Sequence, residues 1–230
     1  MHIQILPLLV RLIDFFSIAF TALLPLINPL GSAILFLGLI GPVDTVVYKH
    51  LARKIALFTV LFLVVIDLLG ALLLTFFGIS LPVVQVAGGL VIASMGWNLL
   101  NQPDAPDATQ VTQPAKSLQT LYSKAFYPFT FPLTAGPGTV VVTLTLAAHA
   151  EQPTSIASIF SHLGLFLAIV VLSVMVYFAY GYAPALARKI SPQTIHGILR
   201  IISFILLAIG VQIFWRGAEI LLRQALRIHS

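Results

Sequence analysis

Six long apolar runs are the feature that most restricts the fold of this 230-residue chain. A membrane-spanning helix needs about 20 apolar residues, because each residue adds ~1.5 Å and the hydrocarbon layer is ~30 Å thick. The runs cover residues 13–40, 55–77, 82–100, 125–148, 156–182 and 198–222. Open sheet edges cannot be satisfied in lipid. We therefore expect an all-α integral membrane protein with six transmembrane helices, surrounded by membrane lipid.

Composition excludes most other classes of protein. Hydrophobic residues make up 59% of the chain and charged residues only 8%, whereas a soluble domain is about one-quarter charged. The basic residues behind the net charge of +5 are scattered and form no dense patch, so no nucleic-acid partner is expected. Cysteine is absent, which removes disulfides and thiolate metal sites. No hydrolase, phosphate-loop or dinucleotide motif occurs, so we expect neither enzyme activity nor a cofactor or metal.

One polar stretch divides the chain, which we interpret as a single membrane domain. Residues 101–124 are rich in proline, glutamine, aspartate and threonine, and this composition is typical of a flexible loop. Three spans lie in each half, at 1–100 and 125–230. An odd number of spans turns the second copy over, so the two halves are predicted to be inverted three-helix repeats.

An octet rich in proline and glycine recurs in the first segment of each half, at residues 25–32 and 132–139. At an offset of 107, Pro25 matches Pro132, Leu26 matches Leu133, Gly31 matches Gly138, and Ser32 faces Thr139. Proline removes an amide donor inside a helix, and glycine weakens the turn further. Broken helices are therefore predicted in segments one and four.

Broken helices in a membrane leave polar backbone groups that survive only inside protein or beside a watery cavity. The positive ends of the half-helices would suit a carboxylate, and the freed carbonyls would suit a cation or an ammonium group. A structural kink packed against a neighbour is the alternative, and re-entrant hairpins are equally compatible with the loop charges. The predicted substrate-binding residues are Asn28, Pro29, Gly31, Ser32, Thr134, Ala135, Gly136, Gly138, Thr139 and Gln212.

Asp67 is the one carboxylate deep inside a segment, where its insertion costs about 2.5 to 3.5 kcal/mol. We interpret it either as a proton- or sodium-coupling group that faces the breaks or as a protonated or hydrogen-bonded link between helices. Gln212 can bridge helices as well as bind substrate. Gln85 and His162 lie near the starts of their segments and are expected at the interface, with a proton relay as the alternative for His162.

The distribution of basic residues predicts the orientation. If every segment crosses, the loops at 41–54, 101–124 and 183–197 share a side that carries 7 basic residues, and the other side carries 3. Cytoplasmic loops are enriched in lysine and arginine. Both termini are therefore predicted to lie outside the cytoplasm.

Three motifs resemble those of the MarC family of six-span inner-membrane proteins. They are residues 28–31 in the first span, 132–138 in the fourth and 208–212 in the sixth. The resemblance covers nearly the whole chain in span number and loop placement, and it implies a transporter-type membrane protein, some of whose relatives carry small neutral amino acids. The chain departs from the family pattern at Gln85, where arginine is frequent, and at Ser203, where glycine is frequent.

The sequence therefore favours a secondary transporter of a small polar solute, most plausibly a neutral amino acid, across the cytoplasmic membrane. The solute would bind near the midplane between the two breaks, with a proton or sodium as the coupling ion. The alternative is a non-transporting membrane scaffold whose breaks shape a partner-binding surface. A channel would need a continuous polar pore, for which the spans are too apolar. The sequence leaves open whether the chain forms a homo-oligomer.

Overall fold

A computed structural model describes residues 5–41, 43–101, 118–151, 155–189 and 192–228, and every regular element in these ranges is helical. The first half contains α1 (Ile5–Ile27), α2 (Pro29–Ile40), α3 (Thr45–Phe76) and α4 (Leu81–Leu100). The second contains α5 (Leu118–Ser123), the π-helix η2 (Ala125–Thr134), α6 (Pro137–Ala150), α7 (Ser155–Gly181), α8 (Ala183–Lys189) and α9 (Pro192–Ile228). Within the described residues, five helical stretches are long and apolar enough to cross a membrane, or six if the bent pair η2–α6 is one span. The predicted all-α membrane fold is confirmed.

The first break lies at Asn28, between α1 and α2. Asn28 adopts the left-handed conformation with φ 44°, and its side-chain Oδ1 accepts a hydrogen bond from the Gly31 amide at 3.1 Å. Pro29 follows as the first residue of α2, where its missing amide hydrogen costs nothing. The break predicted in the first segment is confirmed, and its cause is an asparagine cap followed by proline.

The second break is sharper, because η2 and α6 meet at 70°. Gly136 caps α6 in an extended conformation and Pro137 is the first helical residue. Both breaks therefore place a capping residue directly before a proline, and Asn28 and Gly136 lie 108 positions apart. This is one residue more than the offset of 107 that aligned the octets. The prolines that begin the helices, Pro29 and Pro137, set the breaks, and the identical residues of the octets lie on either side of them.

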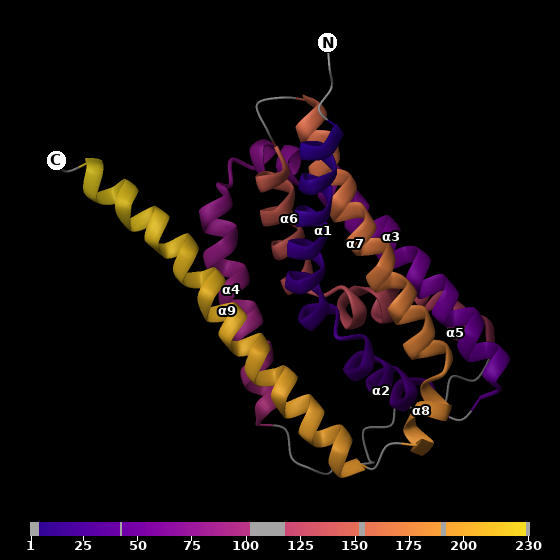
Figure 1. The fold of residues 1–230 in the computed structure, drawn as a ribbon. Coiled ribbons are helices and arrows are strands. Elements are labelled where there is room, and N and C mark those ends of the chain that lie inside the picture. Colours follow the sequence, from indigo (N-terminus) through magenta and orange to yellow (C-terminus); the bar gives the residue numbers. More distant parts are fainter. Residues whose placement is uncertain (1–4, 42, 102–117, 152–154, 190–191, 229–230) are drawn as a thin grey trace.

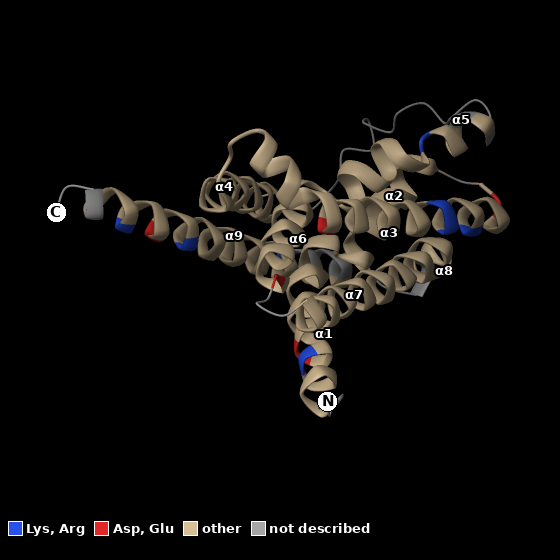
Figure 2. Ribbon diagram, turned by 90° about the horizontal axis from the view of Figure 1, so that it is seen from above, with Lys and Arg blue, Asp and Glu red and all other residues tan. Residues whose placement is uncertain are grey.

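The helices pack in pairs that cross between the two halves (Figures 1 and 2). Helix α1 packs on α7, and α6 packs on α3; likewise α2 contacts α7, and η2 contacts α3. Helices α3 and α7 contact each other, and so do α4 and α9. Each of these contacts between the halves has a counterpart with the halves exchanged, whereas the contact of α6 with α7 has none of similar extent. The inverted relation of the two halves stays a prediction.

Helices α4 and α9 approach so closely that backbone meets backbone. A Cβ added to Gly89 would contact the Phe214 amide nitrogen, and one added to Gly210 would contact the Ala93 amide nitrogen. Small residues permit this approach between membrane helices. Figure 1 shows α9 extending beyond α4, and its bounds, Pro192–Ile228, exceed the predicted segment at both ends.

Figure 2 shows most of the charged residues toward the ends of the helices, and Figure 1 shows the start of α1 and the end of α9 toward the same end of the molecule. The predicted loop at 101–124 lies mostly outside the described residues, and its last part forms α5. Beneath these ends, the packed core contains an aromatic group in which Phe36 stacks on Tyr180 at 4.4 Å and meets the edge of Phe129 at 5.2 Å. This group joins α2, η2 and α7 around the two breaks.

Candidate functional site

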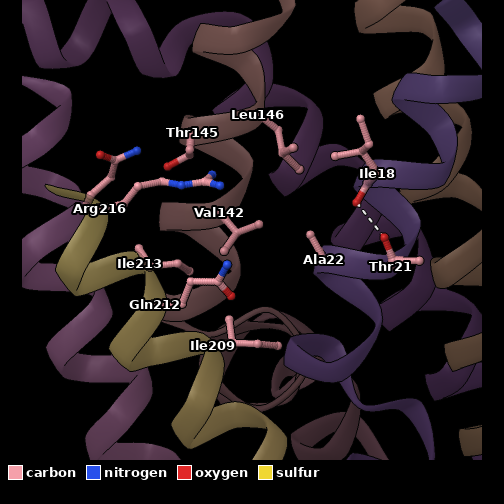
Figure 3. Close-up of a pocket in the computed structure, with 11 residues that line it drawn as sticks. Ile18, Thr21, Ala22, Val142, Thr145, Leu146, Ile209, Gln212, Ile213 and Arg216 are labelled. Atoms are coloured by element: carbon pink, nitrogen blue, oxygen red, sulfur yellow. Dashed lines mark hydrogen bonds between the residues drawn. The ribbon is translucent and has the colours of Figure 1, made fainter.

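A cavity of about 360 Å³ lies where α1, α4, α6 and α9 meet (Figure 3). This volume is within the ~300–1,000 Å³ range of small-molecule sites. These helices are the first and third spans of the two halves, so the cavity lies on the boundary between the halves. Its lining residues are Ile18, Thr21, Ala22, Gln85, Val142, Thr145, Leu146, Ile209, Gln212, Ile213 and Arg216.

Arg216 is the ionisable residue of this lining. Figure 3 shows its side chain extending from α9 toward Thr145 on α6, with the Gln212 amide pointing into the space toward α1. In the described part of the chain, no carboxylate lies within ion-pair distance of Arg216. A guanidinium offers five donors in a planar fork that matches a carboxylate. The cavity therefore carries a net positive charge and a fitting partner for an anionic group.

The hydroxyl groups of the cavity bind their own helices. Thr145 Oγ1 donates to the Val141 carbonyl at 2.9 Å, and Thr21 Oγ1 donates to the Ser17 carbonyl at 2.7 Å. A hydroxyl that donates in this way still has lone pairs available. Thr21 and Thr145 can therefore accept hydrogen bonds from a solute on opposite walls.

Gln85 was expected at the interface, but the structure buries it, with only 3% of the residue exposed. The residue lines the cavity, and its Oε1 is a buried atom that has no hydrogen-bond partner in the structure. An unpaired buried polar atom is costly, which makes Gln85 Oε1 a ready acceptor for an ammonium or amide hydrogen. Helix α9 covers this part of α4, since a Cβ added to Gly217 would lie 2.9 Å from Gln85 Cβ.

The two helix breaks lie beside a second and much smaller cavity. This cavity, about 30 Å³, is lined by Gly136, Gly138 and Thr139 together with Leu26 and Ile92. Such a volume holds about one water molecule. Of the predicted substrate residues, Gln212 therefore lines the large cavity, whereas Gly136, Gly138 and Thr139 line the small one.

Other predicted residues form a hydroxyl cluster that joins the breaks. Thr134 Oγ1 lies 2.8 Å from the Tyr180 hydroxyl, which also interacts with the Ser32 hydroxyl. Ser32 and Thr134 additionally donate to the Asn28 and Phe129 carbonyls, each at 2.7 Å. These contacts give Ser32 and Thr134 a structural role, and their role in binding substrate stays a prediction.

The remaining residues of the breaks shape the backbone. Asn28 caps α2, and Pro29 and Gly31 are buried in its first turn. Ala135 is fully buried, and its amide donates to the Thr130 carbonyl at 2.8 Å. None of these four residues lines the large cavity.

Asp67 pairs with His162 instead of lining either cavity. Asp67 Oδ1 lies 2.8 Å from His162 Nδ1, and the two side chains are 4% and 22% exposed. The pair joins α3 to α7. Within the described ranges, no three histidine, aspartate or glutamate side chains gather into a metal site.

Sequence reasoning missed Arg216, Thr21 and Thr145 as lining residues. One signal was available, because Arg216 follows Gln212 by four positions, which places both on one helix face. Thr21 and Thr145 carry no such signal, since ordinary spans contain many threonines bonded to their own backbone.

A family model described as MarC family integral membrane protein matches residues 13–222. The inner membrane protein MarC of Escherichia coli strain K12 is 29% identical over 204 residues, which cover 87% of this chain and 92% of that protein. The MarC protein of Shigella flexneri matches with the same identity and coverage. No solved structure matches the chain. Because the family model covers most of the sequence, this chain belongs to the MarC family of integral membrane proteins.

Proposed function

We propose that this protein is a secondary transporter of a small polar solute, and specifically of a neutral amino acid, across the inner membrane, where the name of its Escherichia coli relative places that protein. The observation that carries the proposal is the cavity between α1, α4, α6 and α9. Secondary transporters bind solute near the boundary of two repeats and expose it alternately as one half rocks against the other. The boundary position of the cavity and the few polar residues in its lining support such a role.

The chemistry of the lining supports an amino acid as the solute. The Arg216 guanidinium fits a carboxylate, and the unpaired Gln85 Oε1 fits an ammonium group. The rest of the wall is largely apolar, with Ile18, Val142 and Ile209 among its residues. A short apolar side chain would be covered by this wall, and a second carboxylate would have no further cation to bind in the cavity.

The helix breaks would serve as hinges in this proposal. Gly138 lies so close to its neighbours that an added Cβ would be 2.6 Å from Ile92 Cγ1 and 3.2 Å from Leu26 Cδ2. A bulky side chain there would push α6 away from α4 and α1. Since α6 carries Thr145 and Leu146 of the cavity wall, this displacement would reach the solute site.

The test is uptake of labelled L-alanine into vesicles that contain the purified protein. We expect Gly138→Leu and Asn28→Leu to abolish uptake while the protein still inserts. Gly38→Leu is the matched control, because an added Cβ at this glycine of α2 meets nothing within 4 Å. Full uptake by both break variants would refute the proposal.

A further inference from the structure

A row of three ionisable groups, which we call the ionisable chain, lies where α3, α7 and the end of α6 meet, and none of the three lines the solute cavity. His162 Nδ1 lies 2.8 Å from Asp67 Oδ1, and His162 Nε2 lies 3.9 Å from Glu151 Oε1. Each nitrogen of one imidazole ring therefore faces a different carboxylate. A neutral imidazole has one donor and one acceptor, whereas a protonated ring donates from both nitrogens. The Nδ1 contact at 2.8 Å is a hydrogen bond, whereas the Nε2 contact at 3.9 Å is within ion-pair distance only.

The three groups form a gradient of exposure. The Glu151 side chain is 71% exposed, that of His162 is 22% exposed and that of Asp67 is 4% exposed. Glu151 follows the last residue of α6, and its Oε2 also accepts a hydrogen bond from Ser158 Oγ at 3.5 Å. The three groups are therefore ordered from solvent to the buried Asp67. A proton that follows this order goes from Glu151 to His162 Nε2, once the exposed Glu151 side chain has closed the 3.9 Å gap, while the hydrogen on Nδ1 moves to Asp67 Oδ1.

Further titratable groups lie on the neighbouring helices α1 and α6. Arg11 on α1 donates from Nε to Ser161 Oγ at 3.0 Å, so this guanidinium is bound beside the ionisable chain. Asp14 on α1 is exposed. His149 on α6 places its Nδ1 2.6 Å from the Thr145 carbonyl of its own helix. The carboxylates that face the ring are therefore those of Asp67 and Glu151.

Helix α6 lies between the ionisable chain and the solute cavity. Its Leu144 side chain contacts the face of α3 at Gly70, less than one turn from Asp67, and Glu151 directly follows its last residue. Its Val142 and Thr145 line the cavity. Because α6 begins at the sharp break after η2, a change in the charge that holds its far end can tilt the helix and alter the cavity wall.

We propose that Asp67, His162 and Glu151 form the proton-binding site of this transporter, and that α6 couples the bound proton to the solute cavity. This inference rests on the transport function proposed above. It adds the coupling ion, the residues that hold it and the helix that connects them. A proton is the only species that moves between the three groups, so the step needs no further reactant.

The experiment separates coupling from solute movement in vesicles that contain the full-length protein. Exchange of labelled for unlabelled L-alanine at equal concentrations needs no driving force. Accumulation under an imposed gradient of about one pH unit needs a coupled proton, and one proton per alanine allows at most about tenfold accumulation. The gradient is imposed in both directions, since the sequence leaves the direction of transport open.

We expect the wild type to exchange alanine and to accumulate it under one direction of the gradient. Asp67→Asn and His162→Gln should keep the exchange and lose the accumulation, so that the inside-to-outside ratio stays near one. Asp14→Asn is the matched control on an exposed aspartate and should accumulate alanine like the wild type. Glu151→Gln should reach the wild-type ratio more slowly, because it removes only the group that receives the proton from solvent.

Accumulation by Asp67→Asn and His162→Gln at the wild-type ratio would overturn the proton site, and so would a wild type that exchanges alanine without accumulating it. If these two variants do not fold, Glu151→Gln decides, since its exposed side chain does not threaten the fold and an unchanged rate would contradict the relay. A wild type that exchanges no alanine would instead contradict the transport function.

Discussion

Removing the guanidinium of Arg216 should weaken the binding of any solute that carries a carboxylate. A hydrogen bond to a charged group contributes about 1.5 to 3 kcal/mol. Since about 1.4 kcal/mol corresponds to a tenfold change in affinity, Arg216→Gln should raise the dissociation constant of L-alanine about 10- to 150-fold. Arg216→Lys keeps the charge but loses the planar fork, and its effect should be intermediate.

The assay compares L-alanine with L-alaninol, in which a hydroxymethyl group replaces the carboxylate, by titration calorimetry on the purified protein. The wild type should bind alaninol about 10- to 150-fold more weakly than alanine, and Arg216→Gln should bind the two with similar affinity. The matched control is Arg223→Gln, because Arg223 lies on the same helix, pairs with Glu219 at 2.6 Å and does not line the cavity. If Arg216→Gln still prefers alanine by the wild-type factor, the guanidinium does not hold the carboxylate.

Three further substitutions test the account of the helix breaks by thermal unfolding in detergent. Tyr180→Phe should lower the free energy of unfolding by only about 0.5 to 1.5 kcal/mol, because Thr134 keeps its hydrogen bond to the Phe129 carbonyl. Tyr180→Ala should lower it by about 3 to 5 kcal/mol, because the aromatic packing is lost. Equal effects of the two substitutions would contradict the packing role of Tyr180. Asn28→Ala should lower the free energy of unfolding by about 1 to 2 kcal/mol more than Asn28→Gly, since glycine tolerates the left-handed conformation at φ 44°. A larger loss for Asn28→Gly would contradict a role of this conformation in the break. Gly138→Ala should destabilise the protein by about 1 to 3 kcal/mol through its contact with Ile92, and an unchanged midpoint of unfolding would show that α6 has room to move.

The membrane fold was predictable because its main determinants are local. Apolar runs of sufficient length specify spans, and proline beside asparagine or glycine specifies where a span breaks. Asn28-Pro29 and Gly136-Pro137 are visible in the sequence, and the structure breaks the helices at both. The octet alignment was one residue off because identical residues on either side of a break do not report which residue caps the next helix.

The solute cavity was mostly beyond prediction because four helices build it. Its polar residues Thr21, Gln85, Thr145 and Arg216 come from four different segments, and no pattern along one segment shows which helix faces will meet. Gln212 was identified since it is a polar residue deep in a span. The other predicted residues cluster at the breaks, where their hydrogen bonds hold the backbone.

The pairing of Asp67 with His162 is a second long-range feature. The two residues are 95 positions apart, and they meet because α3 packs on α7. The sequence marked Asp67 as functionally important through its depth in a segment. The sequence did not identify His162 as the partner of Asp67, because a histidine at the start of α7 also suits the membrane interface.

The most direct test of the central claim is protection of the cavity by solute. The chain contains no cysteine, so Thr145→Cys introduces a single thiol into the wall of the cavity. We measure how fast a membrane-impermeant maleimide labels this thiol with and without L-alanine. The control is Val46→Cys, which replaces an exposed residue near the start of α3. We predict that alanine slows labelling at position 145 and leaves position 46 unchanged. Identical labelling at position 145 with and without alanine would contradict the claim that the solute binds in this cavity.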